Sequence, residues 1–230
     1  MPDLATDDRL GFVLAAGGSG QRFGGPVPKT LVDLAGRPVW THSRETIRAT
    51  FPDAVIVAVV PEDNRERFDD VDVVVTGGST RADSVDRGLK ELRRFGVVWA
   101  GVHDAARPLV TAGDLIAVVA AAKRFGAAIL TTPVVATVKR TDGDRVTETI
   151  DRATLRLALT PQVARLDWLL QPLSDSDRPP TDESQRLERA GRIVHTVDGD
   201  PENLKITTAS DLIVAEAILA ARSQSGEPEV

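Results

Sequence analysis

The chain of 230 residues contains no cysteine and only three histidines. Without cysteine the protein cannot form disulfide bonds, thiolate zinc sites or a cysteine nucleophile. No apolar run approaches the ~20 residues of a membrane span. The first residues, 1–8, also lack the basic start and apolar stretch of a signal peptide. These absences predict a soluble, cytoplasmic protein that does not enter a membrane.

The chain has no surplus of positive charge, since 28 Lys and Arg stand against 34 Asp and Glu, a net charge of −6. Five of the acids lie near the two ends of the chain, at Asp3, Asp7, Asp8, Glu227 and Glu229. Residues 9–222 therefore carry 28 basic and 29 acidic side chains, a net charge of −1. A nearly neutral body does not present the positive field that binding to a phosphate backbone requires, so we expect no nucleic-acid partner.

The sequence does contain five short apolar runs that are rich in valine and isoleucine. They span residues 10–15, 54–60, 71–75, 97–102 and 127–132. Uninterrupted runs of this kind are typical of strands that are buried on both faces of a parallel sheet. The alternation of such strands with helical segments predicts an α/β fold, a three-layer sandwich around a mostly parallel, Rossmann-like sheet.

The segments between these runs repeat apolar side chains with a period near 3.6, as amphipathic helices do. One such stripe comprises Leu115, Val118, Val119, Ala122 and Phe125. Thr111 is expected to cap the start of this helix, and Gly126 its end. Later in the chain, Thr181 is expected to cap a helix that ends at Gly191. A strand should follow over residues 192–197, and Ser210 should cap the last helix.

The strand–helix alternation breaks after Pro133. Residues 137–141 and 144–150 are strand-like and flank Asp142-Gly143, a strong hairpin-turn dipeptide. An isolated two-stranded hairpin is marginal in water. The hairpin, at about residues 134–152, therefore either packs on its own domain or forms an arm that is stabilised by a second subunit. We find no linker, so we expect a single domain over residues 1–230 with disordered tails at 1–8 and 223–230.

A long glycine-rich loop follows the first strand, over residues 15–29. It is not a dinucleotide fingerprint, because Phe23 occupies the position of the third glycine. It is not a P-loop either, because Pro28 stands directly before Lys29. The loop is either a flexible surface segment or a phosphate-binding loop with two cations, Arg22 and Lys29. Its place at the carboxyl edge of the sheet favours ligand binding.

Six segments, in order along the chain, carry a specific resemblance. They are Leu14–Gly17 with Arg22 and Pro28-Lys29, Gly77–Val85, Val102–Pro108, Thr137–Lys139, Leu159–Gln162 and Asn203–Thr207. Over residues 10–222 the chain resembles the 2-C-methyl-D-erythritol 4-phosphate cytidylyltransferases, a nucleotidyltransferase family of the non-mevalonate isoprenoid pathway. The resemblance implies that a sugar phosphate attacks the α-phosphorus of CTP and releases pyrophosphate. A phosphate monoester, with a second pKa of about 6, is already an anionic nucleophile at neutral pH and needs no activating histidine or serine.

The resemblance also implies roles for particular residues. The catalytic set is Arg22, Lys29, Arg152 and Lys205. The nucleotide-binding set is Ala15, Ala16, Gly17, Gly18, Ser19, Gly20, Gly78, Ser79, Arg81, Ser84 and Asp104. The set that binds the sugar phosphate is Asp104, Arg107, Thr137, Arg152, Thr160, Thr181 and Lys205. A Mg²⁺ cofactor is implied, held mainly through phosphate oxygens, with Asp104 as the candidate protein ligand.

Other interpretations of these residues remain open at this stage. Residues 77–84 could simply start a helix, with Thr80 and Asp83 as its cap. Asp104 and Arg107 could simply form a local ion pair. Ser79 departs from the family pattern, in which many members have an aspartate, and this leaves one contact to the base in doubt.

The three histidines and the identity of the substrate leave further alternatives. We expect His42 to be exposed, His195 to be structural, and His103 either structural or an orienting partner of Asp104. The implied partners are CTP, a polyol phosphate and a second copy of the chain bound through the arm. Ribitol 5-phosphate is an alternative acceptor, and a nucleotide-binding protein without turnover is an alternative class.

Overall fold

The computed structural model describes residues 8–17, 27–172 and 178–225. Its centre is a seven-stranded sheet in the order β11-β7-β10-β6-β1-β4-β5, in which only β10 runs antiparallel to its neighbours. The strands are β1 Leu10–Ala15, β4 Val55–Val60, β5 Val73–Thr76, β6 Trp99–Asp104, β7 Ala127–Pro133, β10 Arg156–Arg165 and β11 His195–Asp198. Each of the five strands predicted from apolar runs is confirmed, with ends shifted by at most two residues.

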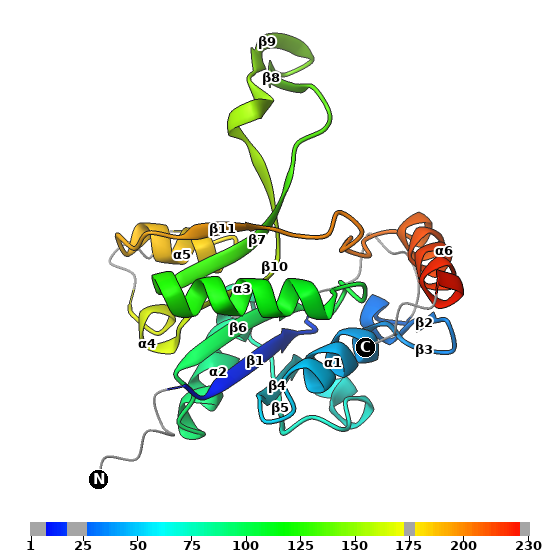
Figure 1. The fold of residues 1–230 in the computed structure, drawn as a ribbon, viewed down its shortest axis with the longest axis vertical. Helices are drawn as coiled ribbons and strands as arrows, with labels where there is room; N and C mark the ends of the chain where they lie inside the picture. Colours follow the sequence, from blue (N-terminus) through cyan, green and yellow to red (C-terminus); the bar gives the residue numbers. More distant parts are fainter. Residues whose placement is uncertain (1–7, 18–26, 173–177, 226–230) are drawn as a thin grey trace.

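Helices cover both faces of the sheet, which confirms the three-layer arrangement (Figure 1). Apolar side chains of α1 Val39–Thr50 and α3 Ala112–Phe125 pack on one face. Those of α2 Arg81–Arg94, α4 Leu166–Leu169 and α5 Glu183–Arg189 pack on the other. Alternate residues of β4 point into the two cores: Ile56 packs on the side of α1 and α3, and Val57 on the side of α2, α4 and α5. This is expected for a strand that is buried on both faces.

A smaller apolar cluster attaches the last helix to the body of the protein. α6 Ala209–Ser225 packs through Ala215 and Leu219 against Leu34 of β2 Asp33–Leu34, which pairs with β3 Arg37–Pro38 in a small hairpin. Within the described residues there are three short 3-10 helices, η1 Lys29–Leu31, η2 Glu62–Arg67 and η3 Arg152–Thr154. No helix in the described part of the chain is long and apolar enough to cross a membrane.

Several helix boundaries agree with the sequence. Thr111 caps α3 by accepting a hydrogen bond from the Asp114 amide, and Gly126 ends the helix at φ +95°. Thr80 and Asp83 form a reciprocal capping box at the start of α2. Phe125, the last member of the predicted stripe of α3, is instead 42% exposed and stacks on the ring of His195, which is consistent with a structural role for that histidine.

Other boundaries correct the sequence-based expectations. Asp182, and not Thr181, caps α5, because its carboxylate accepts the Gln185 amide. α6 begins at Ala209, before Ser210, and the hydroxyl of Thr208 accepts the Asp211 amide. Neighbouring Ser, Thr and Asp residues have similar capping ability, so the sequence did not specify which one caps.

The strand predicted over 192–197 and the expected C-terminal tail also differ from the structure. The strand is β11, His195–Asp198, and it starts three residues later. α6 continues to Ser225. The prediction that disorder starts at residue 223 is therefore wrong for residues 223–225. Residues 226–230 and 1–7 lie outside the described part of the chain.

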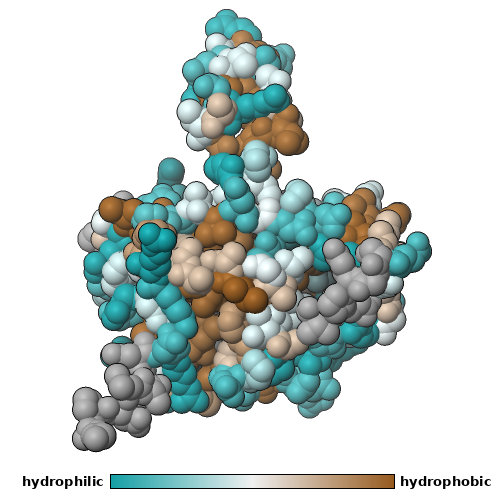
Figure 2. All heavy atoms as spheres, viewed as in Figure 1, coloured by the Kyte–Doolittle hydropathy of each residue, from teal (hydrophilic) through white to brown (hydrophobic). Residues whose placement is uncertain are grey.

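β8 Val138–Asp142 and β9 Arg145–Ile150 form a hairpin that projects from the body (Figure 1). Almost every residue of the two strands is exposed, so the hairpin does not pack on its own domain. Its turn is Gly143-Asp144, one residue later than predicted, with Gly143 at φ +58°. Figure 2 shows hydrophobic residues among hydrophilic ones on this arm. Val135, before β8, and Val146, in β9, are 83% and 56% exposed.

Candidate functional site

The carboxyl ends of β1 and β6 bring the start of the glycine-rich loop beside Asp104. Ala15 and Asp104 are register partners in the sheet, and the Ala105 amide donates to the Ala15 carbonyl at 3.1 Å. The Ala16 amide donates to the Val59 carbonyl at 2.9 Å, which holds the chain in line beyond the end of β1. The loop therefore leaves the sheet at the edge where open α/β folds bind ligands.

The start of α2 adds a second wall to this site. The Gly78 amide donates to Oγ of Ser84 at 3.0 Å, and a Cβ on Gly17 would lie 3.9 Å from the same oxygen. A Cβ on Gly78 would come within 2.4 Å of the Cβ of Asp83, so the turn requires glycine there. The start of the loop therefore lies close to the start of α2. Because Gly17 and Gly78 have no side chains, the backbone is left open at this point.

Ser79 has a defined local partner. Its hydroxyl donates to the Asp83 carboxylate at 2.8 Å, and the same carboxylate accepts the Thr80 amide at 3.1 Å. The helix-start interpretation of this segment is therefore confirmed, together with its position beside the loop. The hydroxyl proton of Ser79 is committed to the helix cap.

Asp104 is the centre of a group of charged side chains, here called the Asp104 cluster: Asp104, Arg81, Arg107, Lys205 and Glu183. Lys205 Nζ lies 2.7 Å from Oδ2 of Asp104, and Arg81 Nε and Nη2 each lie 3.4 Å from Oδ1. Arg107 Nε lies 3.9 Å from Oδ2, so the expected ion pair exists as one part of a larger network. Three cations against two carboxylates leave the cluster with a net positive charge suited to phosphate groups.

Arg81 is held between two carboxylates from distant parts of the chain. Its Nη1 and Nη2 donate to the two oxygens of Glu183 at 2.9 and 3.1 Å. Such bidentate pairs are strong and fix the plane of the guanidinium. The side chain of Glu183 is only 4% exposed, so removing its partner would leave a buried charge.

The electrostatics of the cluster follow from burial and charge pairing. Burial alone would raise the pKa of Asp104, but the positive charges of Lys205 and Arg81 outweigh it and hold the pKa well below the ordinary value. Burial raises the pKa of Glu183, and the charge of Arg81 opposes this shift. Burial lowers the pKa of Arg107. Asp104 is therefore a stable carboxylate at neutral pH.

Thr160 and Asn203 connect the cluster to β10 and to the segment before α6. Thr160 Oγ1 accepts the Asp104 amide at 3.1 Å, and Asn203 Nδ2 donates to the Thr160 carbonyl at 2.9 Å. The carbonyl of Asn203 accepts Nη1 of Arg107 at 2.7 Å. Arg107 Nε is buried and has no hydrogen-bond partner among the described residues, so the guanidinium retains an unused donor beside Asp104.

The structure gathers some of the predicted site residues and leaves others apart. Those brought together are Ala15, Ala16, Gly17, Gly78, Ser79, Arg81, Ser84, Asp104, Arg107, Thr160 and Lys205. Lys29 is half-buried and opens η1, directly after Pro28. Arg22, Gly18, Ser19 and Gly20 lie outside the described residues.

Thr137 and Arg152 lie at the stem of the arm. Both are exposed, and Arg152 Nη1 donates to the Val135 carbonyl of the same arm. Among the contacts described for it, none joins Arg152 to the Asp104 cluster. Thr181 is also exposed. It lies two residues before Glu183, and its amide donates to Oε1 of Gln185 at 2.9 Å.

Sequence reasoning gave no role to Glu183 or Asn203. An acidic residue in the first turn of a helix is an ordinary feature of exposed helices, so Glu183 gave no signal of burial. Asn203 belonged to a quoted segment, but its contacts depend on β10, which the sequence analysis did not predict. The role of Glu183 depends on its pairing with Arg81, 102 positions away, and that of Asn203 on its hydrogen bond to Thr160, 43 positions away.

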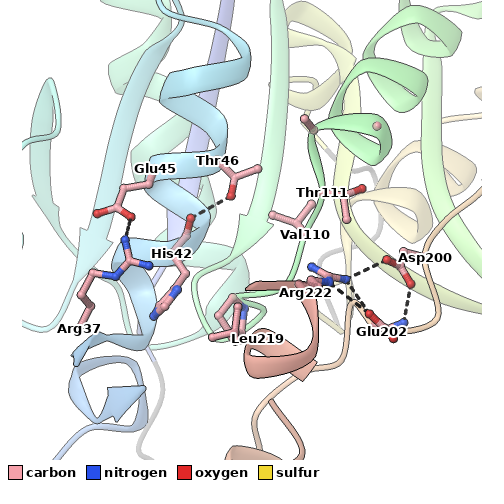
Figure 3. A pocket seen from close by; sticks show the side chains of 13 residues that line it. Arg37, His42, Glu45, Thr46, Val110, Thr111, Asp200, Glu202, Leu219 and Arg222 are labelled. Atoms are coloured by element: carbon pink, nitrogen blue, oxygen red, sulfur yellow. Dashed lines mark hydrogen bonds and ion pairs between the residues drawn. The ribbon is translucent and has the colours of Figure 1, made fainter. Parts of the chain in front are cut away.

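His42 corrects another expectation, because it is buried rather than exposed. Its Nε2 lies 2.9 Å from the Leu34 carbonyl. His42 lines a separate cavity of about 610 Å³ between α1, the start of α3 and α6 (Figure 3). No member of the Asp104 cluster lines this cavity. Its arginines are paired with carboxylates, Arg37 with Glu45 and Arg222 with Asp200, so it offers less positive charge to a polyanion.

A metal ion held by the protein alone needs several carboxylate or imidazole ligands close together. No group of three or more His, Asp or Glu side chains in the described segments is placed to hold one. Asp104 contributes a carboxylate, but each of its oxygens already faces a cationic side chain. This donor set fits an ion that is bound mainly through ligand phosphates, with Asp104 as the nearby protein oxygen ligand.

A mostly parallel sheet with a glycine-rich loop after its first strand and a cationic cluster beside the start of that loop is the arrangement expected of a nucleotidyltransferase. A family model described as 2-C-methyl-D-erythritol 4-phosphate cytidylyltransferase matches residues 10–221. The chain therefore belongs to the 2-C-methyl-D-erythritol 4-phosphate cytidylyltransferase family, and it is a cytidylyltransferase.

Individual relatives agree with this assignment. The 2-C-methyl-D-erythritol 4-phosphate cytidylyltransferase of Rhodopirellula baltica is 39% identical, with 91% of this chain and 94% of the relative covered. That of Chromobacterium violaceum is 40% identical, with 92% and 98% covered. The crystal structure of the Thermus thermophilus enzyme has a TM-score of 0.77 at 28% identity, covering 92% of this chain and 99% of the other. That of 4-diphosphocytidyl-2C-methyl-D-erythritol synthase from Anaerococcus prevotii has a TM-score of 0.79 at 27% identity, covering 93% and 99%.

Proposed function

We propose that the chain transfers CMP from CTP to 2-C-methyl-D-erythritol 4-phosphate at the Asp104 cluster. The products are 4-diphosphocytidyl-2-C-methyl-D-erythritol and pyrophosphate. Membership of the family supports the reaction, and the observation that carries the assignment of the site is the cationic cluster at the carboxyl ends of β1 and β6. Two polyanions must meet there, and fixed cations reduce the cost of that encounter.

The reaction is a direct attack of a phosphate oxygen of the sugar phosphate on the α-phosphorus of CTP. An O–P bond forms as the bond to the pyrophosphate oxygen breaks, and pyrophosphate leaves with the electron pair. The attacking phosphate is mostly dianionic at neutral pH, since its second pKa is about 6, so no general base is required. Arg22 and Lys29 stabilise the charge that develops at phosphorus.

The walls of the site divide between the two substrates. Ala15, Ala16, Gly17, Gly78 and Ser84 border the base. The close approach of Gly17 to Ser84, where an added Cβ would lie 3.9 Å from Oγ, favours the smaller pyrimidine over a purine. Gly18, Ser19 and Gly20 supply backbone amides to the triphosphate, and Ser79 and Arg81 border it.

Arg107 and Lys205 hold the sugar phosphate, and Thr160 and Thr181 lie at the edge of its site. Asp104 faces hydroxyl groups of either substrate. Asp104 would be the protein oxygen ligand nearest to a Mg²⁺ ion, which would supply further neutralisation of negative charge.

The arm completes the site of a second copy of the chain in a homodimer. Its strands are exposed and carry apolar side chains, while an isolated hairpin of this length is marginal in water. Thr137 and Arg152 at its stem have no contact with their own Asp104 cluster among the interactions described. They therefore serve the sugar phosphate of the partner. A cytoplasmic location, expected from the sequence, stays a prediction.

The test is pyrophosphate release from CTP and Mg²⁺ with either 2-C-methyl-D-erythritol 4-phosphate or ribitol 5-phosphate. Turnover with the first alone is the expected result. Turnover with ribitol 5-phosphate alone would keep the chemistry and overturn the acceptor. CTP binding without turnover on either acceptor would contradict the proposed reaction.

A further inference from the structure

His103 occupies a fully buried position in β6, directly before Asp104. Its ring has a hydrogen-bond partner at each nitrogen. Nε2 lies 3.1 Å from the carbonyl oxygen of Arg107, and Nδ1 lies 3.1 Å from Oγ1 of Thr160. The same Thr160 oxygen lies 3.1 Å from the amide nitrogen of Asp104. The imidazole thus touches both ends of the turn from Asp104 to Arg107, one end directly and the other through Thr160.

The protons in this chain of contacts can be assigned one by one. A carbonyl oxygen only accepts, so the bond to Arg107 requires a proton on Nε2 of His103. In a neutral imidazole Nδ1 is then an acceptor, and Thr160 must donate its hydroxyl proton to it. Thr160 Oγ1 in turn accepts the Asp104 amide proton. The ring is fully buried and its two hydrogen-bond partners are uncharged groups, so it is held in the neutral form.

This assignment leaves Thr160 with no proton for a substrate. A phosphate dianion presents only acceptor oxygens, so it needs donors, and a hydroxyl has a single proton to give. Thr160 is also buried, at 5% exposure. Direct donation from Thr160 to the sugar phosphate would therefore require breaking its bond to His103 inside the protein.

We propose that His103 is a positioning residue, whose Nε2-protonated ring takes the proton of Thr160 and thereby holds the Asp104–Arg107 turn in place. Thr160 then acts on the sugar phosphate through the backbone of Asp104 and not by donating to it. The proposal rests on the proposed function only in naming the substrate, because the tautomer and the hydrogen bonds exist without it.

The first test measures the tautomer directly. With ¹⁵N-labelled histidine, the three rings are assigned by comparison with His42→Gln and His195→Phe variants. We expect His103 to show a protonated Nε2 and an unprotonated Nδ1 in the free enzyme, and no change when the sugar phosphate is added. A proton on Nδ1 would overturn the proposal. So would loss of the Nδ1 hydrogen bond on adding substrate.

The second test is a double-mutant cycle between His103→Leu and Thr160→Val. If the hydroxyl acts through the ring, Thr160→Val lowers kcat/KM for the sugar phosphate by roughly tenfold alone but by less than about twofold in the His103→Leu background. Thr160→Ser, which keeps the hydroxyl, should recover most of the loss. His195→Phe, in the edge strand β11 with β7 and β10 between it and β6, is the control.

The outcomes separate the proposal from the proposed function. Thr160→Val could lower kcat/KM by the same factor with and without His103→Leu, through KM for the sugar phosphate alone. That result would mean that Thr160 contacts the sugar phosphate directly, and it would refute the positioning role of His103. Should His103→Leu fail to fold, the tautomer measurement on the unmodified enzyme still decides. If the enzyme turns over a different acceptor, the proposed function fails, while the tautomer result stands or falls independently.

Discussion

The Nζ atom of Lys205 lies 2.7 Å from Oδ2 of Asp104, although 101 positions separate the two residues in the chain. The contact joins the segment before α6 to the end of β6, and it places an ammonium group beside the loop start. It also explains why a largely buried carboxylate remains ionised, since Lys205 is the strongest of the charges that offset its burial. The side chain of Lys205 is 37% exposed, so the ammonium can exchange Asp104 for a phosphate group.

Replacing Lys205 with methionine should weaken use of the sugar phosphate. A hydrogen bond to a charged group contributes about 1.5–3 kcal/mol, so kcat/KM for that substrate should fall by roughly 10- to 150-fold. Steady-state kinetics with each substrate varied in turn will measure this, with KM for CTP changing less. A larger effect on KM for CTP than on KM for the sugar phosphate would contradict the assignment of Lys205.

Replacing Lys29 with alanine should reduce catalysis more than binding. Loss of one fixed electrostatic donor to the transition state costs about 3–4 kcal/mol, so kcat should fall by about 10²- to 10³-fold. Isothermal titration calorimetry should still detect CTP binding. Lys90→Ala, at an exposed position of α2, is the matched control. Loss of CTP affinity with kcat unchanged would assign Lys29 to ground-state binding alone.

The arm proposal predicts complementation between two impaired variants, assayed with the sugar phosphate well below its KM for Arg152→Ala. Arg152→Ala should raise KM for the sugar phosphate. A mixed dimer of Lys29→Ala and Arg152→Ala chains contains one intact site if Arg152 serves its partner. Random mixing then restores activity to about a quarter of the wild-type level. No recovery after subunit exchange, verified by mass spectrometry, would show that each site uses its own arm.

The pH dependence of stability should contain a contribution from His103. Its pKa is about 4 in the folded protein against 6.5 for an unperturbed histidine. As pH falls from 6.5 toward 4, the unfolded chain gains a proton that the folded protein does not bind, so folding loses stability. Linkage gives a slope of up to about 1.4 kcal/mol per pH unit. Urea unfolding at pH 7, 6 and 5 should show a shallower slope for His103→Leu, and identical slopes would rule out this contribution.

Close packing of α2 on the sheet makes a separate prediction at Gly88. A Cβ there would lie 2.7 Å from Cγ1 of Val13 and 2.8 Å from Cγ2 of Val59, both fully buried side chains. Gly88→Ala should therefore lower the free energy of unfolding by about 1–3 kcal/mol. Gly113→Ala, where the nearest atom would be 3.7 Å away, should be neutral or stabilising by up to about 1 kcal/mol. Equal effects in chemical denaturation would argue against a packing origin.

β10 illustrates what local sequence could not reveal. It lies between β6 and β7 and carries the Thr160 and Gln162 side chains, yet Pro161 stands in its middle, and proline argues against a central strand. The structure accommodates the proline where the register to β7 shifts, between Ala158 and Gln162. A pairing of this kind depends on both neighbouring strands, which no local pattern contains.

The sequence by itself determined the parallel strands, the caps at Thr80 and Thr111, the hairpin and the residues of the glycine-rich loop. These depend on hydrophobic period, on short-range hydrogen bonds and on residue types in fixed order, all of which act within a few positions of the chain. Only the tertiary structure decided that Glu183 holds Arg81, that Lys205 and Arg107 share Asp104, and that His103 takes the proton of Thr160. Those relationships arise from burial and from contacts between distant segments, because the strength of a charge or a hydrogen bond is set by what the completed fold places beside it.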